Sequence, residues 1–78
     1  MYLVSIHYRG ILNVDQMRCF TELAEAQEYA REIFGEDRYP PDFRVYKLSA
    51  DAEPVLLHSL SKNGKRRGNG SYYLEFDD

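Results

Sequence analysis

The N-terminal residues alternate between two kinds of position. Over residues 2–8, one set of alternate positions is entirely apolar or aromatic: Tyr2, Val4, Ile6 and Tyr8. This period of two, in a segment rich in Val, Ile and Tyr, predicts a β-strand. A second strand is predicted over residues 11–19, after the turn residue Gly10. Its alternation slips near residues 15–16, where we expect a bulge or an early strand end.

Helical spacing then replaces the period of two. It predicts a helix from about Glu22 to Phe34, with one apolar face made by Leu23, Ala26, Ala30, Ile33 and Phe34. We expect Thr21 to cap its N-terminus, because a threonine hydroxyl can accept a hydrogen bond from a first-turn amide. Gly35 stands where a C-terminal glycine cap is expected.

Three further strands are predicted after the helix, over residues 43–48, 55–60 and 71–76. Between the last two lies segment 61–70, in which two Asn-Gly pairs predict turns. The element order is therefore β-β-α-β-β-β, in a single domain that spans residues 1–78. One helix with an apolar stripe must cover one face of a mostly antiparallel sheet, which gives an α+β two-layer sandwich. We expect the other sheet face to be open to solvent unless a partner covers it.

Composition narrows the classes of protein. With 44% hydrophobic and 29% charged residues in 78 positions, the chain is predicted to fold rather than stay disordered. A single cysteine, Cys19, argues against a disulfide-stapled secreted protein and for a reducing cytoplasm. The N-terminus has no basic start and no long apolar run, so we expect no signal peptide and no membrane span. The two histidines, His7 and His58, lack the paired spacing of a zinc site, and we expect no metal and no cofactor.

The sequence also lacks a recognisable catalytic arrangement. It has no phosphate-binding glycine loop of the Walker or dinucleotide type, and no serine or cysteine in a nucleophile context. So small a domain leaves little room for a walled pocket. We therefore expect a protein without catalytic residues that acts by binding.

Two charged surfaces are the candidate binding sites. The basic segment places four cations within six residues, flanked by Gly and Asn: Lys62, Lys65, Arg66 and Arg67. Such a segment can contact phosphates, and the alternative is a solvated hairpin loop. The acidic stripe lies on the predicted helix, away from its apolar face, and consists of Glu25, Glu28 and Glu32. It can dock on a basic surface in place of nucleic-acid phosphates, and the alternative is an ordinary solvated helix face that Arg31 partly neutralises.

Aromatic side chains form a third candidate. Tyr72 and Tyr73 are neighbours on the last predicted strand, so one ring should lie on each sheet face. Rings on an open face can stack on bases or anchor a protein interface. The alternative is cross-strand packing that stabilises the sheet.

The overall pattern resembles a known group of proteins. The segments that carry the likeness are Phe20-Thr21-Glu22-Leu23-Ala24-Glu25-Ala26, Ile33-Phe34-Gly35 and Phe43-Arg44-Val45-Tyr46. With the strand before them, they resemble small phage-encoded anti-CRISPR proteins, in which a leading strand and a capped, Ala-rich helix precede a curled antiparallel sheet. The likeness covers most of the chain in pattern. It implies inhibition by binding, in which a small rigid body occupies a nucleic-acid channel or an assembly surface of a host defence complex.

Three functional hypotheses follow. The first is a phage or mobile-element inhibitor that binds and blocks a bacterial defence complex, such as a CRISPR–Cas effector, in the host-cell cytoplasm. Its partner would be a host protein or ribonucleoprotein. The second is a small RNA- or DNA-binding accessory module that uses the basic segment and open-face tyrosines. The third is a homo-oligomer that pairs through the uncovered sheet face or an edge strand.

Overall fold

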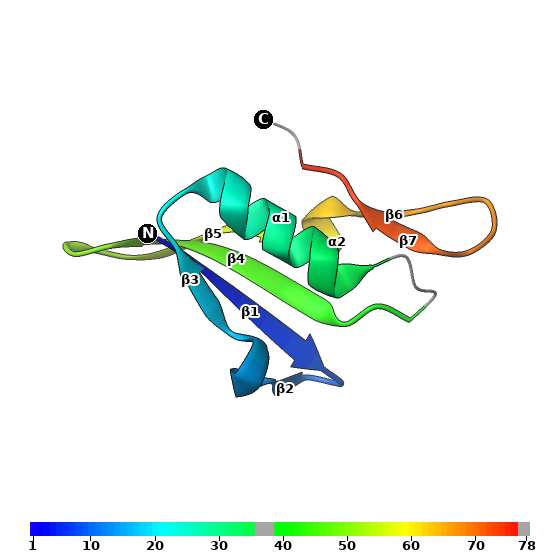
Figure 1. The fold of residues 1–78 in the computed structure, drawn as a ribbon, viewed down its shortest axis with the longest axis horizontal. Helices are drawn as coiled ribbons and strands as arrows, with labels where there is room; N and C mark the ends of the chain where they lie inside the picture. The colour runs from blue at the N-terminus through cyan, green and yellow to red at the C-terminus, as the bar shows by residue number, and fades with distance from the viewer. Residues whose placement is uncertain (36–38, 77–78) are drawn as a thin grey trace.

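The computed structural model describes residues 1–35 and 39–76. Its elements follow in chain order (Figure 1): β1 (Tyr2–Tyr8), β2 (Ile11–Leu12), the 3₁₀ turn η1 (Val14–Gln16), β3 (Arg18–Phe20), α1 (Leu23–Phe34), β4 (Asp42–Ser49), β5 (Ala52–Ser59), α2 (Leu60–Asn63), β6 (Gly64–Arg66) and β7 (Tyr72–Leu74).

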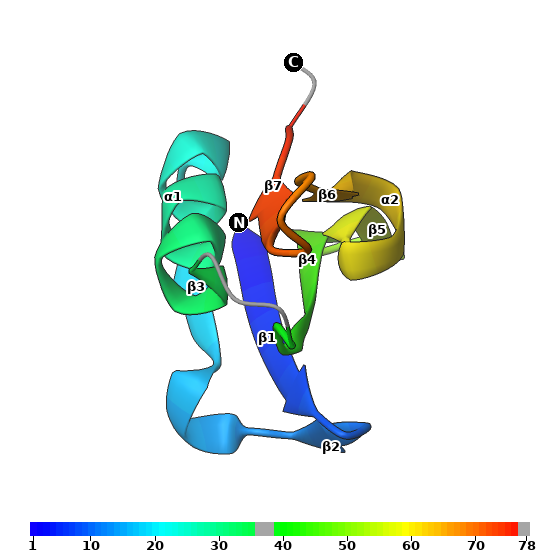
Figure 2. The same ribbon diagram turned by 90° about the vertical axis from the view of Figure 1, so that its right-hand side faces the viewer.

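The main sheet is antiparallel and has the order β2-β1-β4-β5, with β3 also paired to β1. Helix α1 packs on one face of this sheet against β1, β3 and β4, as Figures 1 and 2 show from two sides. This confirms the predicted α+β architecture of one main helix on an antiparallel sheet. The predicted third and fourth strands correspond to β4 and β5. Pro54, expected in the linker before the fourth strand, lies inside β5 at the sheet edge, where a missing N–H is tolerated.

The core lies between the sheet and α1. Val4 pairs with Val45 and Ile6 with Phe43 across β1 and β4, and all four side chains are fully buried. The helix contributes Ala26, Ala30 and Phe34 to the same cluster, and β7 contributes Leu74. The two alanines keep side-chain bulk small where the helix meets the sheet. The predicted apolar stripe of the helix is thus confirmed, with Leu23 and Ile33 packed at its margin.

The segment predicted as a second strand is divided in two. The strand ends after Leu12, before the slip expected near residues 15–16, and the chain makes the turn η1 at that slip before β3. Asn13 stabilises this turn, because its side chain accepts a hydrogen bond from the Asp15 amide at 3.1 Å. β3 then returns to the start of β1, where Cys19 pairs with Leu3.

The helix begins one residue later than predicted, and Thr21 is not its cap. Glu22 occupies the N-cap position and makes no side-chain capping bond. At the other end the expected glycine cap is confirmed. Gly35 has a φ of 63°, and its N–H donates to the Arg31 carbonyl at 3.0 Å. Residues with a β-carbon adopt such a positive φ only with strain, so glycine suits this position.

The largest difference from expectation concerns residues 60–76. The predicted loop contains α2 and β6, and the predicted fifth strand, β7, pairs with β6 in a separate two-stranded sheet. The first Asn-Gly pair, predicted as a turn, joins α2 to β6 instead. The Asn63 side chain holds this junction together by accepting from the Ser59 amide at 3.1 Å and donating to the Glu75 carbonyl at 3.0 Å. Ser59 precedes Asn63 and Glu75 follows it by 12 positions, so the sequence pattern around Asn63 did not indicate these hydrogen bonds.

The sheet face opposite α1 carries a row of side chains with partial exposure. Leu3 lies between Cys19 and Tyr46 in the strand register, and Leu56 follows Tyr46 on β5. Cys19 and Leu56 are exposed, whereas Leu3 and Tyr46 are half-buried. This face is therefore partly open, as the single-helix architecture implies.

Candidate functional site

Positive charge is concentrated in one stretch of the chain. Residues 61–74 contain four cations and no acidic residue. Outside this stretch, six cations and thirteen acidic residues give a net charge of −7, compared with −3 for the whole chain. The cationic surface is thus local, and the rest of the molecule has the opposite sign.

The structure places most of this stretch on a β-hairpin at one end of the molecule, formed by β6 and β7 (Figure 1). Lys65 pairs with Tyr73, and Arg66 pairs with Tyr72. Because side chains alternate along a strand, the hairpin has two different faces. Tyr72 and Leu74 belong to the face that packs on the core cluster, while Lys65 and Tyr73 belong to the other face.

Each hairpin tyrosine carries an arginine over its ring. The Arg66 Cζ atom lies 5.3 Å from the centre of the Tyr72 ring, and the Arg67 Cζ atom lies 4.7 Å from the centre of the Tyr73 ring. Both guanidinium groups are within the range of a cation–π interaction, and both arginines are exposed. A guanidinium held over a ring keeps N–H donors available for other partners. The tyrosines therefore position the arginines while leaving them accessible.

The hairpin tip has a defined conformation. The Arg67 amide donates to the Ser71 carbonyl at 2.7 Å, and the Gly70 amide donates to the Arg67 carbonyl at 3.0 Å. Asn69 Oδ1 accepts from both the amide and the hydroxyl of Ser71, at 3.0 and 2.7 Å. Gly70 has a φ of 89°, which matches the second predicted Asn-Gly turn. These bonds limit the conformational freedom that the tip would lose on binding.

Lys62 lies outside the hairpin, on α2, and is exposed. Within the described residues, Lys62, Lys65 and Arg66 form no ion pair, since the pairs found there are Arg31–Glu28 and Arg44–Asp42. Positive charge that no nearby carboxylate neutralises is the electrostatic requirement for binding a polyanion. The four predicted cations are thus brought to one end of the molecule, three on the hairpin and one on the helix that leads into it.

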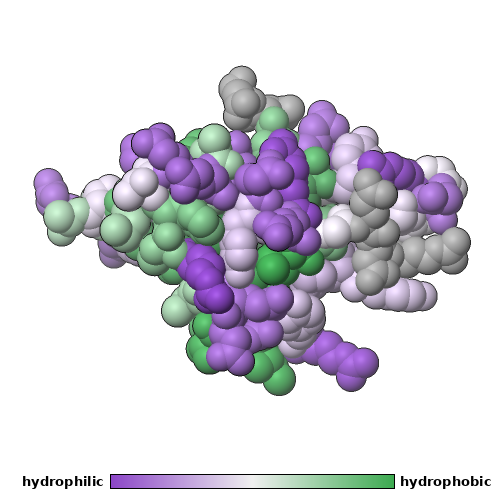
Figure 3. All heavy atoms as spheres, in the orientation of Figure 1, coloured by the Kyte–Doolittle hydropathy of each residue, from purple (hydrophilic) through white to green (hydrophobic). Residues whose placement is uncertain are grey.

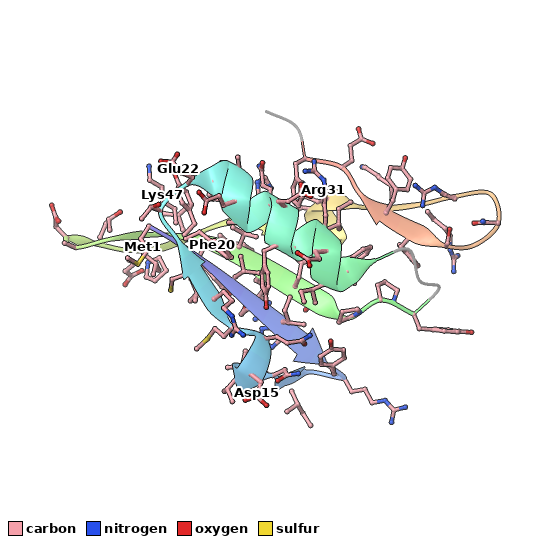
Figure 4. The ribbon with its side chains drawn as sticks, viewed as in Figure 1. Met1, Asp15, Phe20, Glu22, Arg31 and Lys47 are labelled. Atoms are coloured by element: carbon pink, nitrogen blue, oxygen red, sulfur yellow. The ribbon has the colours of Figure 1, made fainter. Side chains whose placement is uncertain are left out.

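The predicted acidic stripe is also present on the surface of α1. Glu25, Glu28 and Glu32 are all exposed, and hydrophilic side chains lie along the helix in Figure 3. Arg31 approaches Glu28 at 3.6 Å and lies 4.8 Å from the centre of the Phe76 ring, beside the segment after β7 (Figure 4). In the sequence, Glu36 and Asp37 extend the acidity past the helix end, and both lie outside the described residues.

One buried polar pair was not indicated by the sequence. Gln27 lies on the buried side of α1, and its Nε2 is 3.1 Å from Nε2 of His58 on β5. The His58 ring also packs 4.6 Å from the Phe76 ring, measured between centres. Burial and these contacts give His58 a structural role. Gln27 and His58 are 31 positions apart, and nothing in the sequence around either residue indicates that the two side chains pair.

No group of three or more His, Cys, Asp and Glu side chains in the described part of the chain is arranged to hold a metal ion. Among the same residues, no helix is long and apolar enough to cross a membrane. The chain matches no protein-family model, and neither a curated protein nor a solved structure is significantly similar to it.

Proposed function

We propose that this protein acts by binding, and that the hairpin formed by β6 and β7 binds nucleic acid. The observation that carries the proposal is the pair of arginines stacked on tyrosines in the one cationic stretch of an acidic chain. Phosphate contacts supply most of the affinity of proteins for nucleic acid, and arginine is well suited to them because its donors match phosphate oxygens in pairs. The proposal requires no catalytic group.

The acidic remainder of the chain restricts how nucleic acid can approach. A body with a net charge of −7 repels a polyanion, so attraction is limited to the end that carries the hairpin. Stacking of Arg66 on Tyr72 and of Arg67 on Tyr73 lowers the entropy that these long side chains lose on binding. A short hairpin with ordered cations can therefore bind phosphates despite the overall negative charge.

The test is the salt dependence of binding to fluorescently labelled oligonucleotides. We expect the logarithm of the association constant to fall linearly with the logarithm of salt concentration, with a slope of about −0.7 to −0.9 for each phosphate contact. Lys65→Gln should weaken binding and reduce the slope by about one contact. Lys47→Gln is the matched control, because Lys47 is also an exposed strand lysine but lies on β4. Absence of binding to every oligonucleotide at low salt would overturn the proposal.

A second candidate function is inhibition of a bacterial defence complex, such as a CRISPR–Cas effector, by a phage- or mobile-element-encoded protein. The observation that favours it is the exposed row of Glu25, Glu28 and Glu32, which offers negative charge to a nucleic-acid-binding surface of a partner. The test is co-purification with a defined effector complex after nuclease treatment. Loss of the complex with Glu25→Lys and Glu32→Lys together, but not with Lys65→Gln, would support this function over the first.

A further inference from the structure

Two open hollows adjoin each other beside the hairpin. The larger hollow, about 670 Å³, is lined by Tyr8 and Arg9 at the β1–β2 turn and by Tyr39 from the segment before β4. The second, about 500 Å³, is lined by Gly64 and Tyr72 at the base of the hairpin. Both are also lined by Asp42 and Leu60, so together they form one groove. Figures 1 and 2 show the β1–β2 turn, the start of β4 and the hairpin following one another along this side.

Aromatic rings occur along the whole groove. Tyr39 is 89% exposed, which is unusual for a large aromatic side chain. The prolines at positions 40 and 41 follow it directly and restrict its backbone to extended conformations. Tyr8 is also exposed, and its hydroxyl donates to Gln16 Oε1 at 2.8 Å. Tyr72, with Arg66 over its ring, stands at the hairpin end of the groove.

The turn at the far end of the groove holds a cation in a strained conformation. Arg9 has a φ of 53° and Gly10 a φ of 82°. Two consecutive positive φ values define a hairpin turn that favours Asn-Gly or Gly-Gly, because a residue with a longer side chain pays a steric cost there. An arginine at this position therefore sacrifices some stability. Strained backbone conformations are concentrated at functional sites, so the strain at Arg9 supports a functional role for this residue.

Among the residues that the structure describes, Asp42 is the only acidic side chain that lines the groove, and its charge is partly neutralised. Asp42 lies 3.6 Å from Arg44, so its charge is offset within the same strand. The groove thus has a cation at each end, Arg9 and Arg66. Its exposed tyrosines, Tyr8 and Tyr39, line the hollow beside Arg9, whereas Tyr72 at the hairpin end is half-buried. Cations matched to phosphates and rings matched to base faces are the two components of single-strand recognition. In a duplex the base faces are stacked on each other and are unavailable to the tyrosines.

We infer that single-stranded nucleic acid occupies this groove, running from the hairpin at Arg66 and Tyr72 to Arg9, with a base stacked on Tyr39. The inference rests on the proposed function and specifies that the nucleic acid bound is single-stranded. Tyr39 contributes stacking that is independent of base identity, and Arg9 contacts a phosphate beyond it.

The experiment compares labelled single-stranded oligonucleotides of about 4 to 16 nucleotides with duplexes of the same lengths. We expect the single strands to bind more tightly. Tyr39→Ala should weaken single-strand binding roughly five- to 150-fold, the effect of removing one stacking ring, whereas Tyr39→Phe should retain it. Because Tyr39 is so exposed, neither substitution should unfold the protein.

Arg9→Asn provides a test in which stability and binding change in opposite directions. Asparagine accepts the turn conformation better than arginine, so the melting temperature should rise or stay constant. Binding of the single strand should nevertheless weaken, with the salt slope reduced by about 0.7, the value for one phosphate contact. A misfolded variant could not give this combination.

The outcomes separate this inference from the proposed function. If Arg66→Gln weakens binding while Tyr39→Ala and Arg9→Asn leave it unchanged, the hairpin binds nucleic acid but the groove does not, and the inference is overturned. Equal affinity for duplex and single strand would also overturn it. If no oligonucleotide binds, the proposed function fails and the inference fails with it.

Discussion

Gly64 and Gly68 lie four residues apart in segment 61–70 and differ in the space around them: Gly64 is closely packed, whereas Gly68 faces open space. A β-carbon on Gly64 would lie 2.6 Å from the carbonyl oxygen of Leu60 and 2.7 Å from its Cδ1 atom. The carbonyl belongs to the backbone of α2 and cannot move without distorting that helix. A β-carbon on Gly68 would meet nothing within 4 Å. We predict that Gly64→Ala destabilises the protein by about 1–3 kcal/mol, the usual cost of overpacking.

Urea unfolding followed by circular dichroism measures this effect, and Gly68→Ala is the matched control. The control should be neutral or slightly stabilising, by up to about 1 kcal/mol, because alanine restricts the unfolded chain. Equal stability of the two variants would show that α2 adjusts to the added methyl group, and that the contact with the Leu60 carbonyl does not limit residue 64.

At this scale the sequence predicted the apolar core positions and missed the polar ones. Ala26, Ala30 and Phe34 follow from helical spacing alone. Gln27 and Asn63 are buried because of hydrogen bonds to residues elsewhere in the fold, His58 for the first and Ser59 and Glu75 for the second. A single sequence does not encode such pairings in any local period, so they could not be predicted.

Among the elements, α1 shows how a local rule can select the wrong residue. Threonine is a preferred cap residue, yet the helix starts from Glu22, which makes no side-chain capping bond. We predict that Glu22→Asp stabilises the protein by about 0.5–2 kcal/mol, because a shorter carboxylate can accept from a first-turn amide without loss of charge. Thermal unfolding checks this. Thr21→Ala should change stability little, and a loss near 1 kcal/mol would restore Thr21 as the cap.

In the hairpin, local rules missed an element altogether, because β6 was not predicted as a strand. Gly64, Lys65 and Arg66 have neither apolar alternation nor β-branched side chains. They form a strand because β7 pairs with them, with Leu74 buried in the core at one end. An isolated two-stranded hairpin is marginally stable in water, so this one depends on its attachment to the body. The charge of the site was evident in the sequence, whereas its shape depended on tertiary contacts.

For the whole molecule, the separation of charge is the property that relates fold to function. Pairing of the two hairpin strands brings the cations of β6 next to the tyrosines of β7. Helix α1 presents its carboxylates from a different element. Pattern analysis predicted both charged surfaces. The groove beside the hairpin was not predicted, because Arg9, Tyr39 and Tyr72 come from three distant segments.

Neutralising the acidic stripe distinguishes the two candidate functions. Replacing Glu25, Glu28 and Glu32 with glutamine raises the net charge by three without changing the shape of these exposed side chains. If the hairpin binds nucleic acid, oligonucleotide affinity should rise a few-fold at low salt, because a source of repulsion is removed. The gain should shrink at physiological ionic strength, where charges separated by more than about 8 Å are largely screened.

If the stripe instead contacts a defence complex, the same triple substitution should abolish co-purification with that complex, since its contacts are electrostatic. Circular dichroism of the variant provides the folding control. An unchanged oligonucleotide affinity at every salt concentration would mean that α1 exerts no field at the hairpin. A lower affinity would contradict the assignment of the hairpin alone and place α1 within the nucleic-acid interface. The stripe thus has a distinct expected effect under each function, and one variant in two assays decides between them.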